Sequence, residues 1–90
     1  MTEERATKIK RLRMRSMRRG IKEMDLILDD FATRHLADMD DAALALYDAL
    51  LSENDHDLYG WVNGQFAVPS QYSDLVTKIA AGATGLTSPA

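Results

Sequence analysis

Hydrophobic residues recur at helical intervals along most of this chain, with polar residues between them. Positions i, i+3, i+4 and i+7 are apolar in two stretches, and related spacings occur in three others. Such spacing places the apolar side chains along one side of a helix, where they can pack against a neighbour. The apolar positions are Ile9, Leu12 and Met17; Met24, Ile27, Leu28 and Phe31; Leu44, Tyr47, Leu50 and Leu51; Leu58, Trp61 and Val62; and Tyr72, Leu75, Val76 and Ile79.

These patterns predict a chain built from helices alone. No segment alternates apolar and polar residues between hairpin turns as a strand would, and no repeat of about 20 to 50 residues occurs. Short connections between helices favour antiparallel neighbours. We therefore predict an all-α fold, a small bundle of about five short helices. Their expected ranges are 3–18, 21–36, 41–51, 55–63 and 69–81.

The length of ninety residues suits a single small domain. We expect the helical domain to span residues 1–81. Residues 82–90 are expected to form a disordered tail, because Gly82, Gly85 and Pro89 interrupt a segment with one large apolar residue. The predicted apolar faces are about what one small core consumes, so we expect a monomer.

Several polar residues and glycines mark where the helices begin and end. Asp40 is a good N-cap, because Met39 and Leu44 would then form a hydrophobic staple around it. Asn54, with an aspartate three residues later, resembles a capping box, and Gly64 suits the end of a helix. The carboxylates around Asp40 lack the glycine and the distal glutamate of an EF-hand loop, so we interpret them as caps rather than as a cation site.

Charge is distributed unevenly along the chain. The first 23 residues carry nine lysines and arginines against three glutamates, whereas the remaining residues carry two basic side chains against eleven acidic ones. The basic first helix is compatible with a solvated surface, with nucleic-acid binding and with docking to an acidic partner. Residues 1–30 contain no aromatic side chain on which a base could stack, which argues against nucleic acid as the partner.

The sequence gives little support for catalysis or for metal binding. It has no cysteine, and it lacks the G-x-S-x-G, P-loop and G-x-G-x-x-G motifs. His35 and His56 have no evident nucleophile or second cluster of ligands, so we interpret both as helix-end residues. We predict that the protein is not an enzyme, has no catalytic residues and binds no metal. Its function is then contact with another molecule.

Targeting features are also missing from the chain. No apolar run approaches the roughly 20 residues that span a bilayer, and the N-terminus lacks the apolar core of a secretory signal. Glu3 and Glu4 argue against an acid-poor transit peptide. We therefore expect no membrane contact and a cytoplasmic location, in a bacterium.

Residues 18–25 form the expected junction between the first two helices. As an N-cap, Gly20 would place Glu23 at the third helical position, where a carboxylate faces unpaired backbone N–H groups. A capped helix junction therefore explains the segment. The same residues suit docking, because Arg19 offers a planar set of donors while Glu23 and Asp25 offer acceptors. Gly20 leaves room for another chain to approach, and the sequence alone keeps both interpretations open.

The junction also resembles the signature of the SdhE family, small assembly factors that promote covalent attachment of FAD to the flavoprotein subunit of succinate dehydrogenase. The RGxxE motif of that family matches Arg19, Gly20 and Glu23, with Arg18 before it and Asp25 after it. The resemblance covers roughly residues 5–80. Further matches in the same order are Leu50, Leu51, Asp55, Asp57, Leu58, Tyr59 and Trp61.

This resemblance implies a chaperone-like role rather than an enzymatic one. The implied partner is the flavoprotein of succinate dehydrogenase, together with the related flavoprotein of fumarate reductase. FAD and the histidine that becomes bonded to it belong to the partner, and we expect no cofactor to be held stably by this chain. The implied partner-binding residues are Arg18, Arg19, Gly20, Glu23 and Asp25. A generic helical adaptor is the alternative, and a nucleic-acid-binding protein ranks third.

Overall fold

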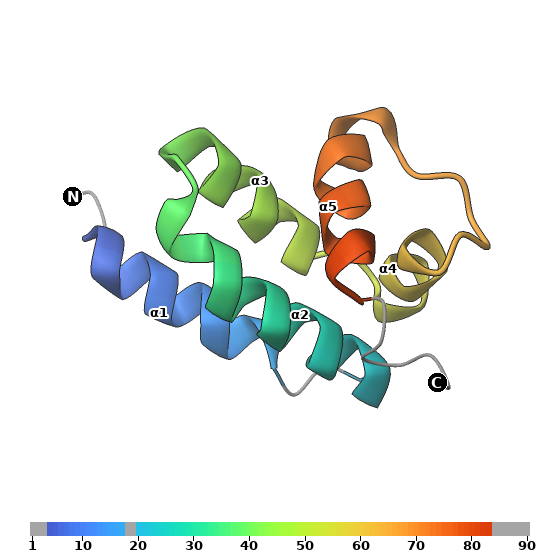
Figure 1. Ribbon diagram of the computed structural model, residues 1–90, viewed down its shortest axis with the longest axis horizontal. Coiled ribbons are helices and arrows are strands. Elements are labelled where there is room, and N and C mark those ends of the chain that lie inside the picture. The colour runs from blue at the N-terminus through green and yellow to red at the C-terminus, as the bar shows by residue number, and fades with distance from the viewer. Residues whose placement is uncertain (1–3, 18–19, 84–90) are drawn as a thin grey trace.

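The computed structural model describes residues 4–17 and 20–83, and these residues form α-helices and short 3-10 turns without any strand. The all-α fold with five α-helices predicted from the sequence is therefore confirmed. Figure 1 shows α1 and α2 lying side by side, with α3 and α5 above them and α4 at one end. The elements are α1 (Arg5–Ser16), α2 (Lys22–His35), the 3-10 turn Leu36–Asp38, α3 (Asp41–Leu51), α4 (Asp55–Val62), the 3-10 turn Ser70–Tyr72 and α5 (Ser73–Ala83).

Several helix boundaries differ from the prediction. Helix α1 ends at Ser16, because Met17 already has extended backbone angles. Helix α5 begins at Ser73 rather than near Pro69, since Pro69 is extended and precedes a 3-10 turn. Helix α5 then continues through Ala83, two residues past the expected boundary of the domain. The rest of the expected tail, residues 84–90, lies outside the described residues.

One hydrophobic core is shared by all five helices, and it contains every predicted apolar residue of α2, α3 and α5. In α1 the single buried apolar residue is Leu12. Tyr47 is the largest fully buried side chain, and its hydroxyl lies 2.6 Å from the buried hydroxyl of Ser16. Trp61 is only partly buried and packs against the Tyr72 ring at a centroid distance of 5.7 Å.

The predicted caps of α3 and α4 are confirmed. A side-chain oxygen of Asp40 accepts a hydrogen bond from the Ala43 N–H at 2.8 Å, and a side-chain oxygen of Asn54 accepts one from the His56 N–H at the same distance. Gly64 follows α4 with a φ of 83°, a left-handed conformation that glycine adopts without strain. These local bonds fix the connections and so determine where each helix points.

Two further contacts hold the end of the bundle that contains α4. Gly60 is buried beneath the Phe66 ring, and a Cβ at this position would overlap that ring. The Tyr72 hydroxyl donates a hydrogen bond of 2.7 Å to a carboxylate oxygen of Glu53. Burial and this negatively charged acceptor raise the pKa of Tyr72 above its ordinary value. These contacts link the segments on either side of α4 to that helix and to the turn that precedes α5.

Candidate docking site at the junction of α1 and α2

The predicted docking residues lie at the surface where the chain enters α2. Gly20 and Glu23 are exposed, and Asp25 is half-buried in the first turn of α2. Exposed carboxylates at this end of a helix lie in the favourable field of its N-terminus. Arg18 and Arg19, which complete the predicted set, lie outside the described residues. Three of the five predicted residues are therefore together on an accessible corner of the fold.

The position of Gly20 relative to α2 differs from the N-cap position considered in the sequence. The N-cap of α2 is Ile21, so Glu23 occupies the second helical position instead of the third. Among the described glycines only Gly64 has a positive φ, so Gly20 is not needed here for a left-handed turn. The expectation that Gly20 caps α2 was wrong. A different requirement must explain a glycine at this position.

That requirement is the close approach of α4. The Gly20 N–H donates a hydrogen bond of 2.7 Å to Oδ2 of Asp55, the first residue of α4. A Cβ on residue 20 would lie 2.9 Å from the same oxygen, which is closer than a carbon and an oxygen normally pack. The junction is therefore tied to α4 by a backbone hydrogen bond that a side chain at residue 20 would disturb.

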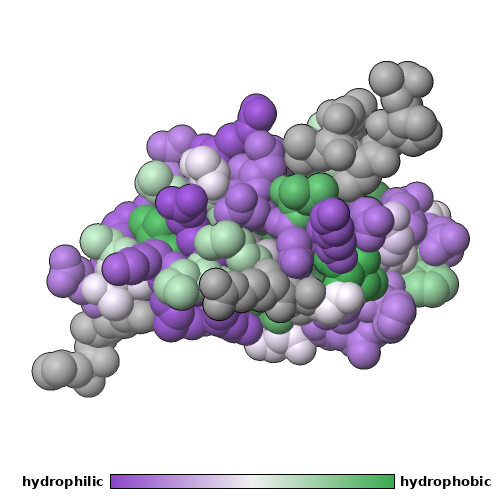
Figure 2. Space-filling view, turned by 90° about the horizontal axis from the view of Figure 1, so that it is seen from below, coloured by the Kyte–Doolittle hydropathy of each residue, from purple (hydrophilic) through white to green (hydrophobic). Residues whose placement is uncertain are grey.

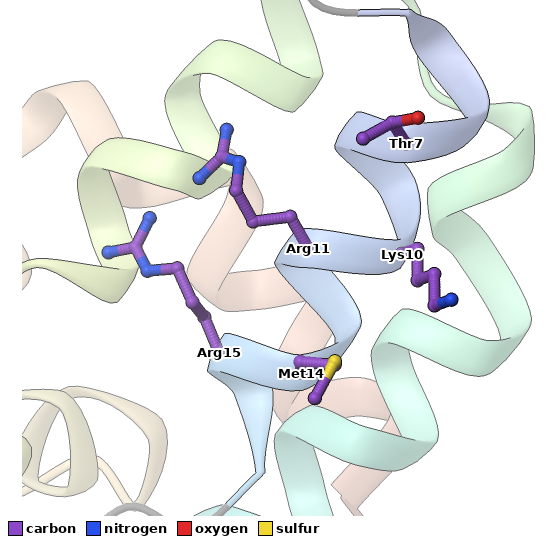
Figure 3. A pocket seen from close by; sticks show the side chains of 5 residues that line it. All are labelled: Thr7, Lys10, Arg11, Met14 and Arg15. Atoms are coloured by element: carbon purple, nitrogen blue, oxygen red, sulfur yellow. The ribbon is translucent and has the colours of Figure 1, made fainter.

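Helix α1 is braced against α3 by an arginine pair that shares one carboxylate. Arg11 and Arg15 both form ion pairs with Asp48, the Arg11 pair at 3.3 Å, and Arg15 also donates a hydrogen bond of 3.1 Å to the Ser52 hydroxyl. Burial raises the pKa of Asp48, but the hydrogen bonds and positive charges of the two arginines outweigh it, so that pKa lies below its ordinary value. Figure 3 shows both arginines reaching from α1 toward α3.

The first turn of α1 is fixed in a similar way. The Arg5 guanidinium donates hydrogen bonds to the carbonyl oxygens of Ala37 and Met39, and it pairs with Asp41 at 3.4 Å. Three of the six basic side chains in α1 therefore form ion pairs within the fold. The prediction of a basic surface on α1 holds only for the remainder.

The histidines and carboxylates show no arrangement for metal binding. Within residues 4–17 and 20–83, no three histidine or acidic side chains gather closely enough to hold a metal ion. The His35 ring packs on Phe31 at a centroid distance of 4.8 Å, and His56 is exposed in the first turn of α4. The described helices are also too short or too polar to cross a bilayer.

The fold and the site together define a small helical protein with an exposed, charged junction that is hydrogen-bonded to α4, and with a first helix that is paired to α3. Sequence comparison then identifies its family. The family described as "Flavinator of succinate dehydrogenase" matches residues 10–83, and the chain belongs to that family. The resemblance to the SdhE assembly factors noted in the sequence is thereby confirmed.

Several named relatives are similar over the same region. A protein of Meyerozyma guilliermondii named "Succinate dehydrogenase assembly factor 2, mitochondrial" is 43% identical over 75 residues, which are 80% of this chain and 56% of that protein. Proteins of the same name from Candida glabrata and Drosophila virilis are 42% and 37% identical, over 77% and 82% of this chain and 48% of each relative. The chain spans about half the length of the curated relatives it matches.

These relatives contradict the expected location. We expected a cytoplasmic protein because the chain lacks targeting features, but the relatives are named as mitochondrial proteins. The expectation had a weak physical basis. A chain that spans half the length of its relatives carries no information about segments beyond the matched region.

Sequence reasoning missed the residues that hold the junction in place. Asp55 lies in the region of family resemblance, yet the pattern around it indicated only the start of a helix. Asp48 lies on the polar side of a predicted helix, where an aspartate normally faces solvent. Neither contact has a signal in local sequence, because each joins residues more than thirty positions apart.

Proposed function

We propose that this chain binds the flavoprotein subunit of succinate dehydrogenase and promotes the covalent attachment of FAD to it. The observation that carries this proposal is the family match over residues 10–83, which includes the exposed junction and the helices α3 and α4. In this proposal the chain is an assembly factor and not an enzyme. FAD and the residue that becomes bonded to it belong to the partner.

The structure suggests how such a protein would act. Glu23 and Gly20 are exposed on a corner where Asp55 holds the Gly20 N–H, and this bond reduces the conformational freedom that is lost when a partner docks. Arg18, Arg19 and Asp25 complete the proposed contact set. Binding energy from this corner would favour the arrangement of the flavoprotein in which FAD and the reacting side chain are aligned.

Co-expression with the flavoprotein tests the proposal through covalent flavin, measured as fluorescence in a denaturing gel. Glu23→Gln keeps the shape of the side chain and removes its charge, and Glu4→Gln makes the same change at another exposed position. We expect Glu23→Gln to lower covalent flavin at least about fivefold, since hydrogen bonds to charged groups contribute about 1.5–3 kcal/mol. Glu4→Gln should leave it unchanged.

A flavoprotein that acquires its full covalent flavin without this chain would refute the proposed function. Full fluorescence with Glu23→Gln would instead refute the assignment of Glu23 alone. The related flavoprotein of fumarate reductase is the second candidate partner, and the same assay applies to it.

A further inference from the structure

Helix α1 presents three sides with different roles. One side carries Leu12 and Ser16 into the core. A second side carries Arg11 and Arg15 to Asp48 of α3. A third side faces outward, and we call it the outer stripe: Ala6, Lys10, Arg13, Met14 and Met17.

The outer stripe is unusually apolar for a surface so rich in charge. The exposed fractions of Met14 and Met17 are 60% and 38%, which makes them two of the four large hydrophobic side chains exposed in the described residues. An open groove of about 330 Å³ runs along the stripe and is also lined by Ile9. Seen from the side of α1 and α2, hydrophobic patches lie among hydrophilic residues (Figure 2). Methionines exposed in a groove adapt readily to a partner.

Among the described residues, no carboxylate engages the two cations of the stripe. Lys10 is exposed and points away from α3, whereas Arg11 and Arg15 point toward it (Figure 3). Arg13 donates a hydrogen bond of 3.3 Å to the Thr33 hydroxyl, a neutral group. Within the described part of the chain, neither Lys10 nor Arg13 pairs with an aspartate or glutamate. Their charge is therefore available to a partner.

We propose that the outer stripe is a second docking surface, and that its occupant is an acidic segment of the flavoprotein with apolar anchors for Met14 and Met17. This inference rests on the proposed function. Two observations support that occupant. Paired cations beside exposed methionines complement a segment that carries both carboxylates and apolar side chains. The stripe also ends at Met17, directly before the junction, so one partner can cover both surfaces.

Binding of the full chain to the FAD-loaded flavoprotein subunit, measured by calorimetry, tests the stripe separately from the junction. Lys10→Glu reverses a charge in the stripe, and Lys78→Glu makes the same change on the exposed face of α5. Met14→Gln removes an apolar anchor while keeping a good helix former. We expect Lys10→Glu and Met14→Gln each to weaken binding about 5- to 20-fold. Lys78→Glu should stay within about twofold of the wild type.

The possible results separate the two proposals. If both stripe variants bind as tightly as the wild type while Glu23→Gln binds more weakly, the stripe proposal is overturned and the proposed function stands. If the wild-type chain does not bind the flavoprotein, the proposed function fails, and the inference fails with it. If the stripe variants change the sedimentation of the free chain instead, the occupant is a second copy, which also overturns the proposal.

Discussion

Gly20 shows how much of the junction is decided by a single residue. Its N–H is hydrogen-bonded to Oδ2 of Asp55, and a Cβ at this position would lie 2.9 Å from that oxygen. Oδ2 is the end of a flexible side chain, so a methyl group at residue 20 would push it slightly aside and lengthen the hydrogen bond. Glycine is therefore favoured here by close packing rather than by backbone conformation.

Gly20→Ala tests this explanation against Gly82→Ala, a helical position where an added Cβ meets nothing within 4 Å. Both changes reduce the freedom of the unfolded chain similarly, so the comparison isolates the native contact. We expect Gly20→Ala to be less stable than Gly82→Ala by up to about 1 kcal/mol, the value that would be lost if the hydrogen bond to Asp55 broke completely. Urea denaturation followed by circular dichroism measures the difference.

A double variant provides the control for that comparison. With Asp55→Ala already in place, the Gly20 N–H has lost this acceptor and the crowding is gone. Gly20→Ala should then lower the free energy of unfolding much less than it does in the wild-type chain. An unchanged cost in the Asp55→Ala background would show that the two residues are not coupled.

At the scale of helices, α1 is attached to its neighbours by a few arginines as well as by its apolar side. Leu12 alone is the buried apolar residue of the helix, a small contribution for a segment of twelve residues. Arg11 and Arg15 add a link to α3 through Asp48, and their side chains are only about a third exposed. The position of α1 therefore depends on charge.

Asp48→Asn should lower the free energy of unfolding by roughly 0.5–1 kcal/mol at neutral pH, a modest value because solvent screens partly exposed ion pairs. The pKa of Asp48 is lowered by folding, so its contribution is present above the pKa of the unfolded chain and is lost as the pH falls through the folded pKa. The difference between variant and wild type should therefore disappear in acid.

Urea denaturation at pH 7 and in acid measures that change, and Asp38→Asn, at an exposed position in the 3-10 turn after α2, is a matched control. Asp38→Asn should change stability by less than about 0.5 kcal/mol at neutral pH. If Asp48→Asn lowers stability equally at both pH values, the shape of the Asp48 side chain matters rather than its charge.

At the scale of the whole molecule, opposite charges occupy different parts of the fold. The basic residues are concentrated in α1 and the junction, while the acidic excess belongs to the segments that follow. Arg5, Arg11 and Arg15 are partly neutralised by acidic residues of those segments, whereas Lys10 and Arg13 make the outer stripe a positive surface. Such a surface steers an oppositely charged partner before contact is made.

The rate of association with the flavoprotein should therefore fall as salt is added. Dissolved salt shortens the range of the protein's electric field to about 8 Å near physiological ionic strength. Steering of a distant partner is therefore weakened more than the contacts within the complex. We expect the association rate to fall about 10-fold or more between 20 mM and 500 mM NaCl, with a smaller change in the dissociation rate. Surface plasmon resonance measures both, and an association rate that does not depend on salt would exclude steering.

The sequence by itself determined the helices and their caps. One example is the apolar spacing of Met24, Ile27, Leu28 and Phe31, which predicts a helix whichever segment packs against it. The Asp40 cap likewise involves residues only three positions apart. Local rules act within a few residues, so they apply before the fold is known.

Only the tertiary structure decided what each polar residue touches. Helical periodicity identifies the buried side of α1, but the rest of its circumference looks the same in sequence whether it faces Asp48 or solvent. The structure separates Arg11 and Arg15, which brace the fold, from Lys10, which does not. It likewise brings Asp55 to Gly20 across thirty-five residues, a contact that depends on how α1, α2 and α4 pack. Such contacts follow from the arrangement of helices, which no local pattern specifies.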